Sequence, residues 1–180
     1  EISLENGLAP ETSFAYPLFG SLIIRYLGTI TTGYEFGTLA IRNLEDNNPE
    51  MFCRTNVVVH NFVYFWKHHL RETLPALAEA ERVGFENGDV EFAQIAATTR
   101  CVNGFILGQD LNTLDANFEA KNARANELNQ TPMLTMGLVF QQCIKNLLAP
   151  TSAPWQLKGE LYDELECVPL HERDRDYTSL

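Results

Sequence analysis

A short segment typical of a helix–helix corner recurs three times along this chain. The copies are 33–40 (GYEFGTLA), 69–77 (HLRETLPAL) and 108–114 (GQDLNTL), which begin 36 and 39 residues apart. Each copy lies between two runs of apolar residues at helical spacing, so each is expected to join two helices. A recurrence of this length indicates stacked helical pairs in which each pair packs on its neighbours. The fold class we predict is all-α: stacked antiparallel helical hairpins, a fragment of a longer array.

The apolar periods also predict where the helical pairs lie. The predicted elements are pairs at about 12–47, 50–87 and 90–129, then an unpaired helix at 132–148. A proline-rich break follows, and 149–180 is predicted to be a weakly helical charged tail. We therefore expect a helical-repeat domain over 1–148 and this tail. Residues 1–7 have the pattern of the last turns of a helix ending at Gly7, as if the chain began inside a longer structure.

The charge balance argues against nucleic acid and membrane partners. The chain has 13 Lys and Arg residues against 24 Asp and Glu residues, a formal net charge of −11. A phosphate-binding face needs clustered basic residues, which this sequence lacks, and an anionic membrane surface is disfavoured for the same reason. No apolar run reaches the roughly 20 residues of a membrane span. We expect a cytoplasmic chain that binds neither nucleic acid nor membrane.

The sequence has none of the motifs that carry catalysis or hold a metal or cofactor. It lacks the phosphate-binding loop, the glycine-rich dinucleotide motif and the Gly-x-Ser-x-Gly nucleophile turn. Its four cysteines form no C-x-x-C pair, and the first three, which lie inside apolar helical runs, are expected to be small buried residues. His171-Glu172 lacks the second histidine of a zinc-protease motif, and His68 and His69 are adjacent, so on a helix they point about 100° apart. We expect no catalytic residue, no metal, no cofactor and no enzymatic activity in this segment.

Aromatic residues are concentrated at 62–66 (FVYFW). Such a cluster can form a ligand cage, but an aromatic stripe at helical spacing is more often part of the core. We therefore expect Phe62 and Trp66 to be buried, and Tyr64, which lies off that stripe, to be less so.

Polar residues on the first helix of each pair are the candidate binding residues. In stacked hairpins these helices line the concave side, where polar groups can bind a peptide or another domain. Plain solvent exposure of the same residues is the alternative interpretation. The candidates are Asn56, His60, Tyr64, Arg100, Asn103 and Gln142.

Three segments resemble a known family. The segments 33–40, 66–75 (WKHHLRETLP) and 84–93 (GFENGDVEFA) are similar to the helical-repeat region of bacterial multi-domain signalling kinases. These are the predicted-ATPase, multi-sensor signal-transduction proteins with serine/threonine-kinase-like and histidine-kinase domains. The resemblance covers roughly 1–148 and implies a tetratricopeptide-like α-α superhelix. The catalytic motifs of that family lie in its other domains, so no catalytic residue is carried over.

The resemblance implies a role without chemistry. The chain is expected to be a scaffold or coupling segment of a bacterial cytoplasmic signal-transduction kinase. Its partners are expected to be another protein, neighbouring domains of the same chain or a second copy in a homodimer. The alternative is an effector-binding sensor that holds a small molecule or peptide in the superhelix groove, with Tyr64, Trp66, Arg100 and Asn103 as the natural contacts.

Overall fold

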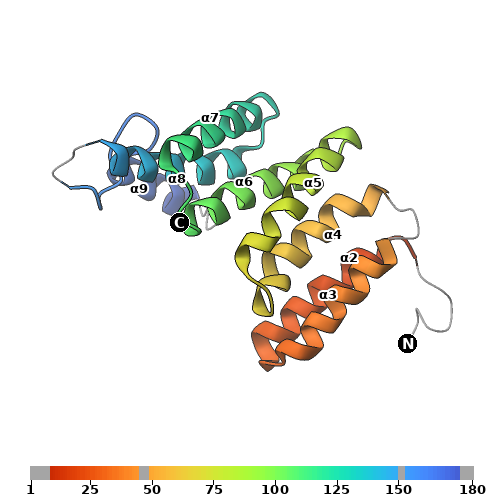
Figure 1. Ribbon diagram of the computed structural model, residues 1–180. Helices are drawn as coiled ribbons and strands as arrows, with labels where there is room; N and C mark the ends of the chain where they lie inside the picture. The colour runs from red at the N-terminus through yellow and green to blue at the C-terminus, as the bar shows by residue number, and fades with distance from the viewer. Residues whose placement is uncertain (1–8, 45–48, 150–152, 175–180) are drawn as a thin grey trace. The chain divides into compact units, whose positions relative to one another are not determined.

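The computed structural model describes residues 9–44, 49–149 and 153–174, and most of the residues in these ranges are helical (Figure 1). The expected helix at 1–7 lies outside the described residues. An isolated bridge between Lys158 and Asp163 is the only β-type pairing in the described ranges. The α-helices are α2 (Thr12–Leu22), α3 (Ile30–Leu44), α4 (Pro49–Phe62), α5 (Thr73–Glu86), α6 (Val90–Ile106), α7 (Leu111–Glu127), α8 (Thr131–Leu148) and α9 (Glu164–Asp174).

Among the described residues, three short helical segments are not α-helical. A π-helix, η1 (Ile23–Leu27), continues α2, and two 3-10 helices, η2 (Tyr64–Trp66) and η3 (Leu70–Glu72), connect α4 to α5. The all-α class is confirmed for the described residues, whereas the tetratricopeptide-like superhelix stays a prediction. None of the described helices has both the length and the apolar character needed to cross a membrane.

The contacts group the chain into two compact units, Glu1–Arg100 and Cys101–Leu180, and α6 supplies residues to both. The sequence suggested a different division, into a helical-repeat domain at 1–148 and a tail at 149–180, and that division stays a prediction.

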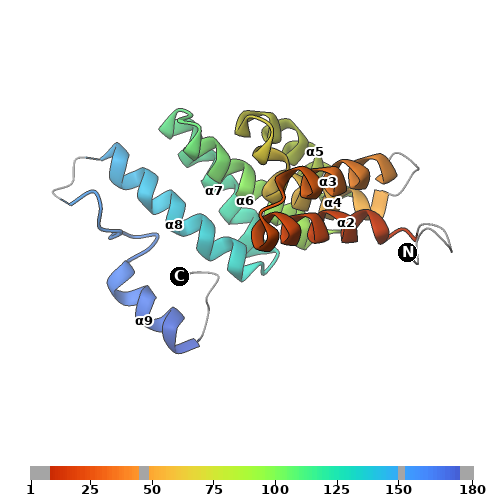
Figure 2. The ribbon, with the colours of Figure 1, turned by 90° about the horizontal axis from the view of Figure 1, so that it is seen from below.

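In the first unit, α2 and α3 form a tight hairpin (Figure 2). A Cβ atom on Gly20 would lie 2.6 Å from the carbonyl oxygen of Gly33, and one on Gly33 would lie 2.5 Å from that of Gly20. Because neither residue has a side chain, the two backbones can approach this closely. The Phe19 and Phe36 rings pack edge to face beside this crossing, with centroids 5.0 Å apart.

The core of the first unit lies between α4, α5 and α6 and is built from small side chains. A Cβ atom on Gly84 would lie 2.6 Å from Sγ of Cys53 and 2.9 Å from Cβ of Ala93, so α5 packs closely on both neighbours. Small residues at a helix contact allow the axes to approach within about 8–10 Å. The buried members of this core are Cys53, Val57, Ala80, Ala93 and Ala96.

In the second unit, α7 packs against α8 around Phe118, which is fully buried. The sequence predicted a helix at 132–148 without a partner. In the structure α8 contacts α7 and is also tied to the chain that follows it. The Asn146 amide donates to the carbonyl oxygen of Gln156 at 2.7 Å, and Gln142 accepts from the backbone N–H of Leu161 at 3.2 Å. The chain after the proline-rich break is thus hydrogen-bonded to α8 before it forms α9.

Candidate functional site

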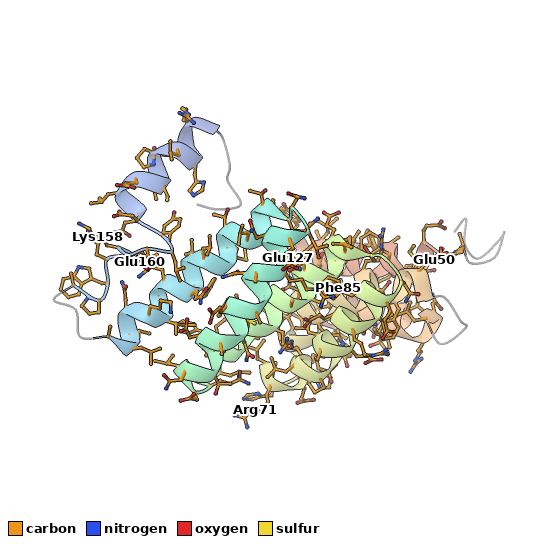
Figure 3. The ribbon with its side chains drawn as sticks, turned by 90° about the horizontal axis from the view of Figure 1, so that it is seen from above. Glu50, Arg71, Phe85, Glu127, Lys158 and Glu160 are labelled. Atoms are coloured by element: carbon orange, nitrogen blue, oxygen red, sulfur yellow. The ribbon has the colours of Figure 1, made fainter. Side chains whose placement is uncertain are left out.

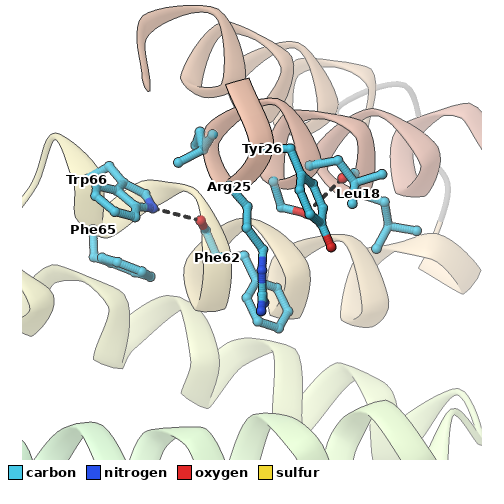
Figure 4. A pocket seen from close by; sticks show the side chains of 9 residues that line it. Leu18, Arg25, Tyr26, Phe62, Phe65 and Trp66 are labelled. Atoms are coloured by element: carbon cyan, nitrogen blue, oxygen red, sulfur yellow. Dashed lines mark hydrogen bonds between the residues drawn. The ribbon is translucent and has the colours of Figure 1, made fainter. Parts of the chain in front are cut away.

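A pocket of about 630 Å³ lies in the first unit, where the end of α2 and η1 face the end of α4 and η2 (Figure 4). We call it the Trp66 pocket. Its walls are apolar or aromatic apart from one serine and one arginine. They are formed by Leu18, Ser21, Leu22, Ile24, Arg25, Tyr26, Phe62, Phe65 and Trp66.

One wall is shaped by the π-helix η1. Ile23 and Ile24 are buried, whereas the next residues, Arg25 and Tyr26, are exposed, Tyr26 by 73%. A π-turn holds more residues than an α-turn, and such turns are frequent at functional sites. The segment ends at Gly28, whose φ of 68° is a left-handed conformation that favours glycine.

The opposite wall is aromatic. The helix α4 ends at Phe62, and Val63 leaves the helical conformation with φ −122°. The indole N–H of Trp66 donates to the carbonyl oxygen of Phe62 at 3.1 Å, and the Phe65 and Trp66 rings stack with centroids 5.6 Å apart. These contacts hold the indole against the end of α4.

The expectation that Phe62 and Trp66 are buried is wrong, because each is 48% exposed. The buried residue of this segment is Val63, at 1%. For Trp66 the reason is the change of helix type after Phe62, the last residue of α4. A 3-10 turn has three residues rather than 3.6, so an α-helical period extended through 62–66 assigns the wrong side chains to the core.

The electrostatics of the Trp66 pocket rest on Arg25. Its guanidinium is exposed and forms no ion pair with any described residue, and no acidic residue lines the pocket. The Ser21 hydroxyl already donates to the Leu18 carbonyl oxygen at 2.7 Å. Arg25 and the Tyr26 hydroxyl are therefore the polar side-chain groups that the walls offer to a ligand.

A second pocket of about 260 Å³ lies beside a cluster of tyrosine and histidine rings in the same unit. The Tyr64 ring stacks on His68 with centroids 4.1 Å apart, and the Tyr34 hydroxyl lies 2.7 Å from Nε2 of His68. The Tyr64 hydroxyl donates to Glu72 at 3.3 Å. Burial and the Glu72 carboxylate raise the pKa of Tyr64 above its ordinary value.

His60 lies under this cluster, with its ring 4.8 Å from that of Tyr64. The imidazole is 8% exposed, and its Nδ1 has no hydrogen-bond partner among the described residues. Burial, with a smaller contribution from His68, lowers the pKa of His60 to about 4. His60 is thus uncharged at neutral pH.

The remaining sequence candidates are engaged inside the protein. Asn56 is 7% exposed and donates to the Phe52 carbonyl oxygen of its own helix, and Arg100 pairs with Glu81 at 2.9 Å. Asn103 and Gln142 are likewise buried, and Gln142 bonds to Asn146 and to the backbone of Leu161. The structure places His60 and Tyr64 side by side, and a binding role for all six candidates stays a prediction.

The sequence reasoning missed Arg25 and the exposure of the aromatic wall. One signal was available for the wall: 62–66 holds four aromatic residues in five, more than one face of a helix can bury.

Metal binding and thiol reactivity depend on how the His, Cys, Asp and Glu side chains in the described part of the chain are grouped and buried. No group of three or more His, Cys, Asp or Glu side chains there is placed to hold a metal ion. Burial raises the pKa of the Cys53 thiol to about 12, so this thiol stays protonated and unreactive at neutral pH.

The described residues thus form packed helical hairpins with an open aromatic pocket in the first unit. Among known proteins, the chain is similar to the hybrid signal transduction histidine kinase G of Dictyostelium discoideum, at 23% identity over 162 residues. The similar region is 87% of this chain but 5% of the kinase, so the chain spans a small part of that relative's length. No model of a protein family matches the chain, and no solved structure matches it.

The comparison shows a distant sequence similarity between this chain and a signal-transduction kinase. The resemblance found in the sequence pointed to bacterial proteins, whereas this relative is eukaryotic. A bacterial origin and the tetratricopeptide-like repeat are therefore not supported by it.

Proposed function

We propose that this chain is a non-catalytic segment of a signal-transduction kinase that couples other parts of the protein by binding a protein segment or a neighbouring domain. The observation that carries the proposal is the similarity to a histidine kinase along 87% of this chain.

The surface of the first unit supports a role in contact. Exposed apolar residues gathered in one place mark interaction sites more often than chance. Leu22, Phe62 and Trp66 are each about half exposed and all line the Trp66 pocket. Water contact with this surface is unfavourable, so covering it with a partner stabilises the complex.

The test uses the complete protein that carries this chain. Trp66→Ala removes an exposed side chain, so the fold is retained while the pocket loses one wall. The expected result is a change of severalfold in the rate of autophosphorylation or phosphotransfer. Trp155→Ala is the matched control, because Trp155 is 81% exposed and lies outside the pocket. Equal kinase output from both variants and the unaltered protein would contradict the proposed coupling role.

A second candidate function, an effector-binding sensor, is favoured by the size of the same pocket. A volume of about 630 Å³ lies within the range of roughly 300–1,000 Å³ typical of small-molecule sites. Its test is a thermal-shift screen of the chain against a metabolite library. A sensor gives a ligand-dependent shift that Trp66→Ala abolishes, whereas a pure scaffold gives none.

A further inference from the structure

We propose that the Trp66 pocket receives an amphipathic helix of a partner protein whose apolar residues are flanked by acidic ones, and that Arg25 pairs with one of those carboxylates. This inference rests on the proposed function and names the chemistry of the partner.

The composition of the pocket fits a protein partner. The centres of protein interfaces are enriched in Trp, Tyr, Phe and Arg and depleted in Lys, Asp and Glu. The walls of the Trp66 pocket contain all four of the enriched types and no Lys, Asp or Glu. They include one serine, Ser21, a type that is also depleted, and its hydroxyl is already bonded to the Leu18 carbonyl oxygen.

The openness of the walls argues in the same direction. A small ligand is usually buried over about 70–90% of its surface. Here Leu22 is 51% exposed and Trp66 is 48% exposed, so the walls form a broad surface rather than an enclosed chamber. A helix laid across this surface can bury several of these side chains at once.

The charge of the surroundings selects an acidic partner. Arg25 is the charged residue in the walls, and it lacks an ion-pair partner among the described residues. Outside the walls, the Lys67 ammonium lies over the Tyr34 ring, 4.9 Å from its centroid, and Arg71, which projects away from the helices (Figure 3), is followed by the exposed Glu72. The chain as a whole carries −11, but charges beyond about 10 Å are largely screened at physiological salt, so Arg25 in the walls is the charge that a bound segment meets at close range.

The hydrogen-bonding groups of the walls favour a helix over an extended segment. The Trp66 indole N–H and the Ser21 hydroxyl are already bonded to backbone carbonyl oxygens. An extended segment needs partners for its own N–H and C=O groups, and the walls offer few. A helix satisfies these groups internally and presents an apolar stripe, which is one of the common modes of peptide recognition.

The experiment measures binding of designed peptides to the 180-residue chain. The chain has two tryptophans, so the variant Trp155→Phe leaves Trp66 as the only tryptophan reporter. The probe is a side-chain-stapled helical peptide of about 16 residues, with leucines on one face and glutamates beside them. Two matched peptides replace the glutamates by lysines or the leucines by alanines. Binding is followed by the blue shift of Trp66 emission and by the anisotropy of the labelled peptide.

The expected result is tighter binding of the acidic peptide than of the lysine peptide, and no binding of the alanine peptide. Arg25→Gln weakens binding of the acidic peptide about threefold to tenfold, and Arg25→Glu reverses the preference toward the lysine peptide. The matched control is Arg42→Gln, because Arg42 is also exposed but lines the other pocket. Circular dichroism establishes that each variant is folded.

Three results would overturn the inference. The first is equal binding of the acidic and lysine peptides. The second is that Arg25→Gln affects peptide binding no more than Arg42→Gln does. The third is that Trp66 emission shifts only with chain concentration or with a small metabolite. The last result identifies a second copy or an effector as the occupant. If no peptide binds but Trp66→Ala still changes kinase output, the inference about the partner is wrong and the proposed function stands. If the acidic peptide binds but Trp66→Ala leaves kinase output unchanged, the proposed function is wrong and the inference stands.

Discussion

At the scale of single residues, His60 and Arg54 show how burial and geometry decide what a polar side chain contributes. His60 is enclosed without a partner for Nδ1, whereas Arg54 donates two hydrogen bonds of 3.0 Å to the Asp89 carboxylate. A positive charge on the buried His60 ring would destabilise the folded state. The charge of Arg54 instead stabilises it, because the ion pair joins α4 to Asp89 in the turn before α6.

His60 makes the stability of the first unit depend on pH. The unfolded chain binds a proton at His60 near pH 6.5, while the folded chain does so only near pH 4, because burial disfavours the charged ring. Acid therefore favours unfolding. The contribution of the neutral His60 ring to the free energy of unfolding is complete above about pH 6.5 and is lost as the pH falls toward 4. The expected loss over this window is about 3 kcal/mol. It is measured by urea unfolding at a series of pH values.

His60→Leu removes this titration and should flatten the dependence between pH 6.5 and 4. His69→Asn is the control, since His69 is exposed and caps η3 through the Arg71 N–H, and asparagine caps equally well. If the two substitutions change the pH dependence of the unfolding free energy equally, His60 is not the source of that dependence.

Arg54 is expected to be sensitive to a substitution that keeps its charge. Its guanidinium binds Asp89 with two bonds and lies 5.0 Å from the centroid of the Phe92 ring, whereas a lysine ammonium cannot form the two-bonded pair and cannot stack as a planar group. Arg54→Lys should lower the free energy of unfolding by about 1 kcal/mol. Arg82→Lys, at an exposed pair of ion contacts with Glu79 and Glu86, should leave chemical denaturation nearly unchanged.

At the scale of elements, the contact between α2 and α3 depends on the absence of side chains. Gly20 and Gly33 each face the other's carbonyl oxygen at a distance no Cβ atom could accept. The two helices must separate if either glycine gains a side chain, because a backbone atom cannot rotate away as a flexible side chain can.

Gly20→Ala is therefore expected to lower the free energy of unfolding by about 2 kcal/mol. Gly28→Ala is the comparison, because a Cβ there meets open space and the cost, about 1 kcal/mol, comes only from the left-handed φ of 68°. Thermal or urea unfolding of the two variants gives the difference. A larger loss for Gly28→Ala would mean that the glycine crossing is looser than described.

The helices were predictable from sequence because their apolar residues follow a 3.6-residue period and their ends carry recognisable residues. Asp110 accepts from the Thr113 N–H at the start of α7, for example, and Gly108, with φ 70°, precedes it. The π- and 3-10 turns were not predictable, since they depend on which carbonyl each N–H selects once the helices are packed. The Trp66 pocket is formed by those turns, so its walls could not be assigned by an α-helical period.

At the scale of the whole molecule, the described residues form two sets of core residues. One is centred on Cys53 and Ala80, the other on Leu114 and Phe118. Stability is therefore expected to be distributed by unit rather than uniformly along the chain.

Phe118→Ala should lower the stability of the second unit by about 3–5 kcal/mol, since it leaves a cavity where a fully buried ring contacts Phe140. Native-state hydrogen exchange should accelerate in α7 and α8 more than in α2 and α3. Leu77→Ala, in α5, should reverse this order, because Leu77 is fully buried in the first unit. Equal acceleration in all helices would show that the chain unfolds as one cooperative body.

The π-turn at Ile23–Leu27 has a consequence for comparing sequences of this kind. A π-turn arises when one residue is inserted into an α-helix, and each added residue rotates those that follow by about 100°. A homologue that lacks one residue between Leu22 and Arg25 would present its arginine about 100° away around the axis of α2. A single-residue gap in an alignment at this turn therefore marks homologues whose arginine no longer lines the pocket. This holds even where the arginine itself is conserved.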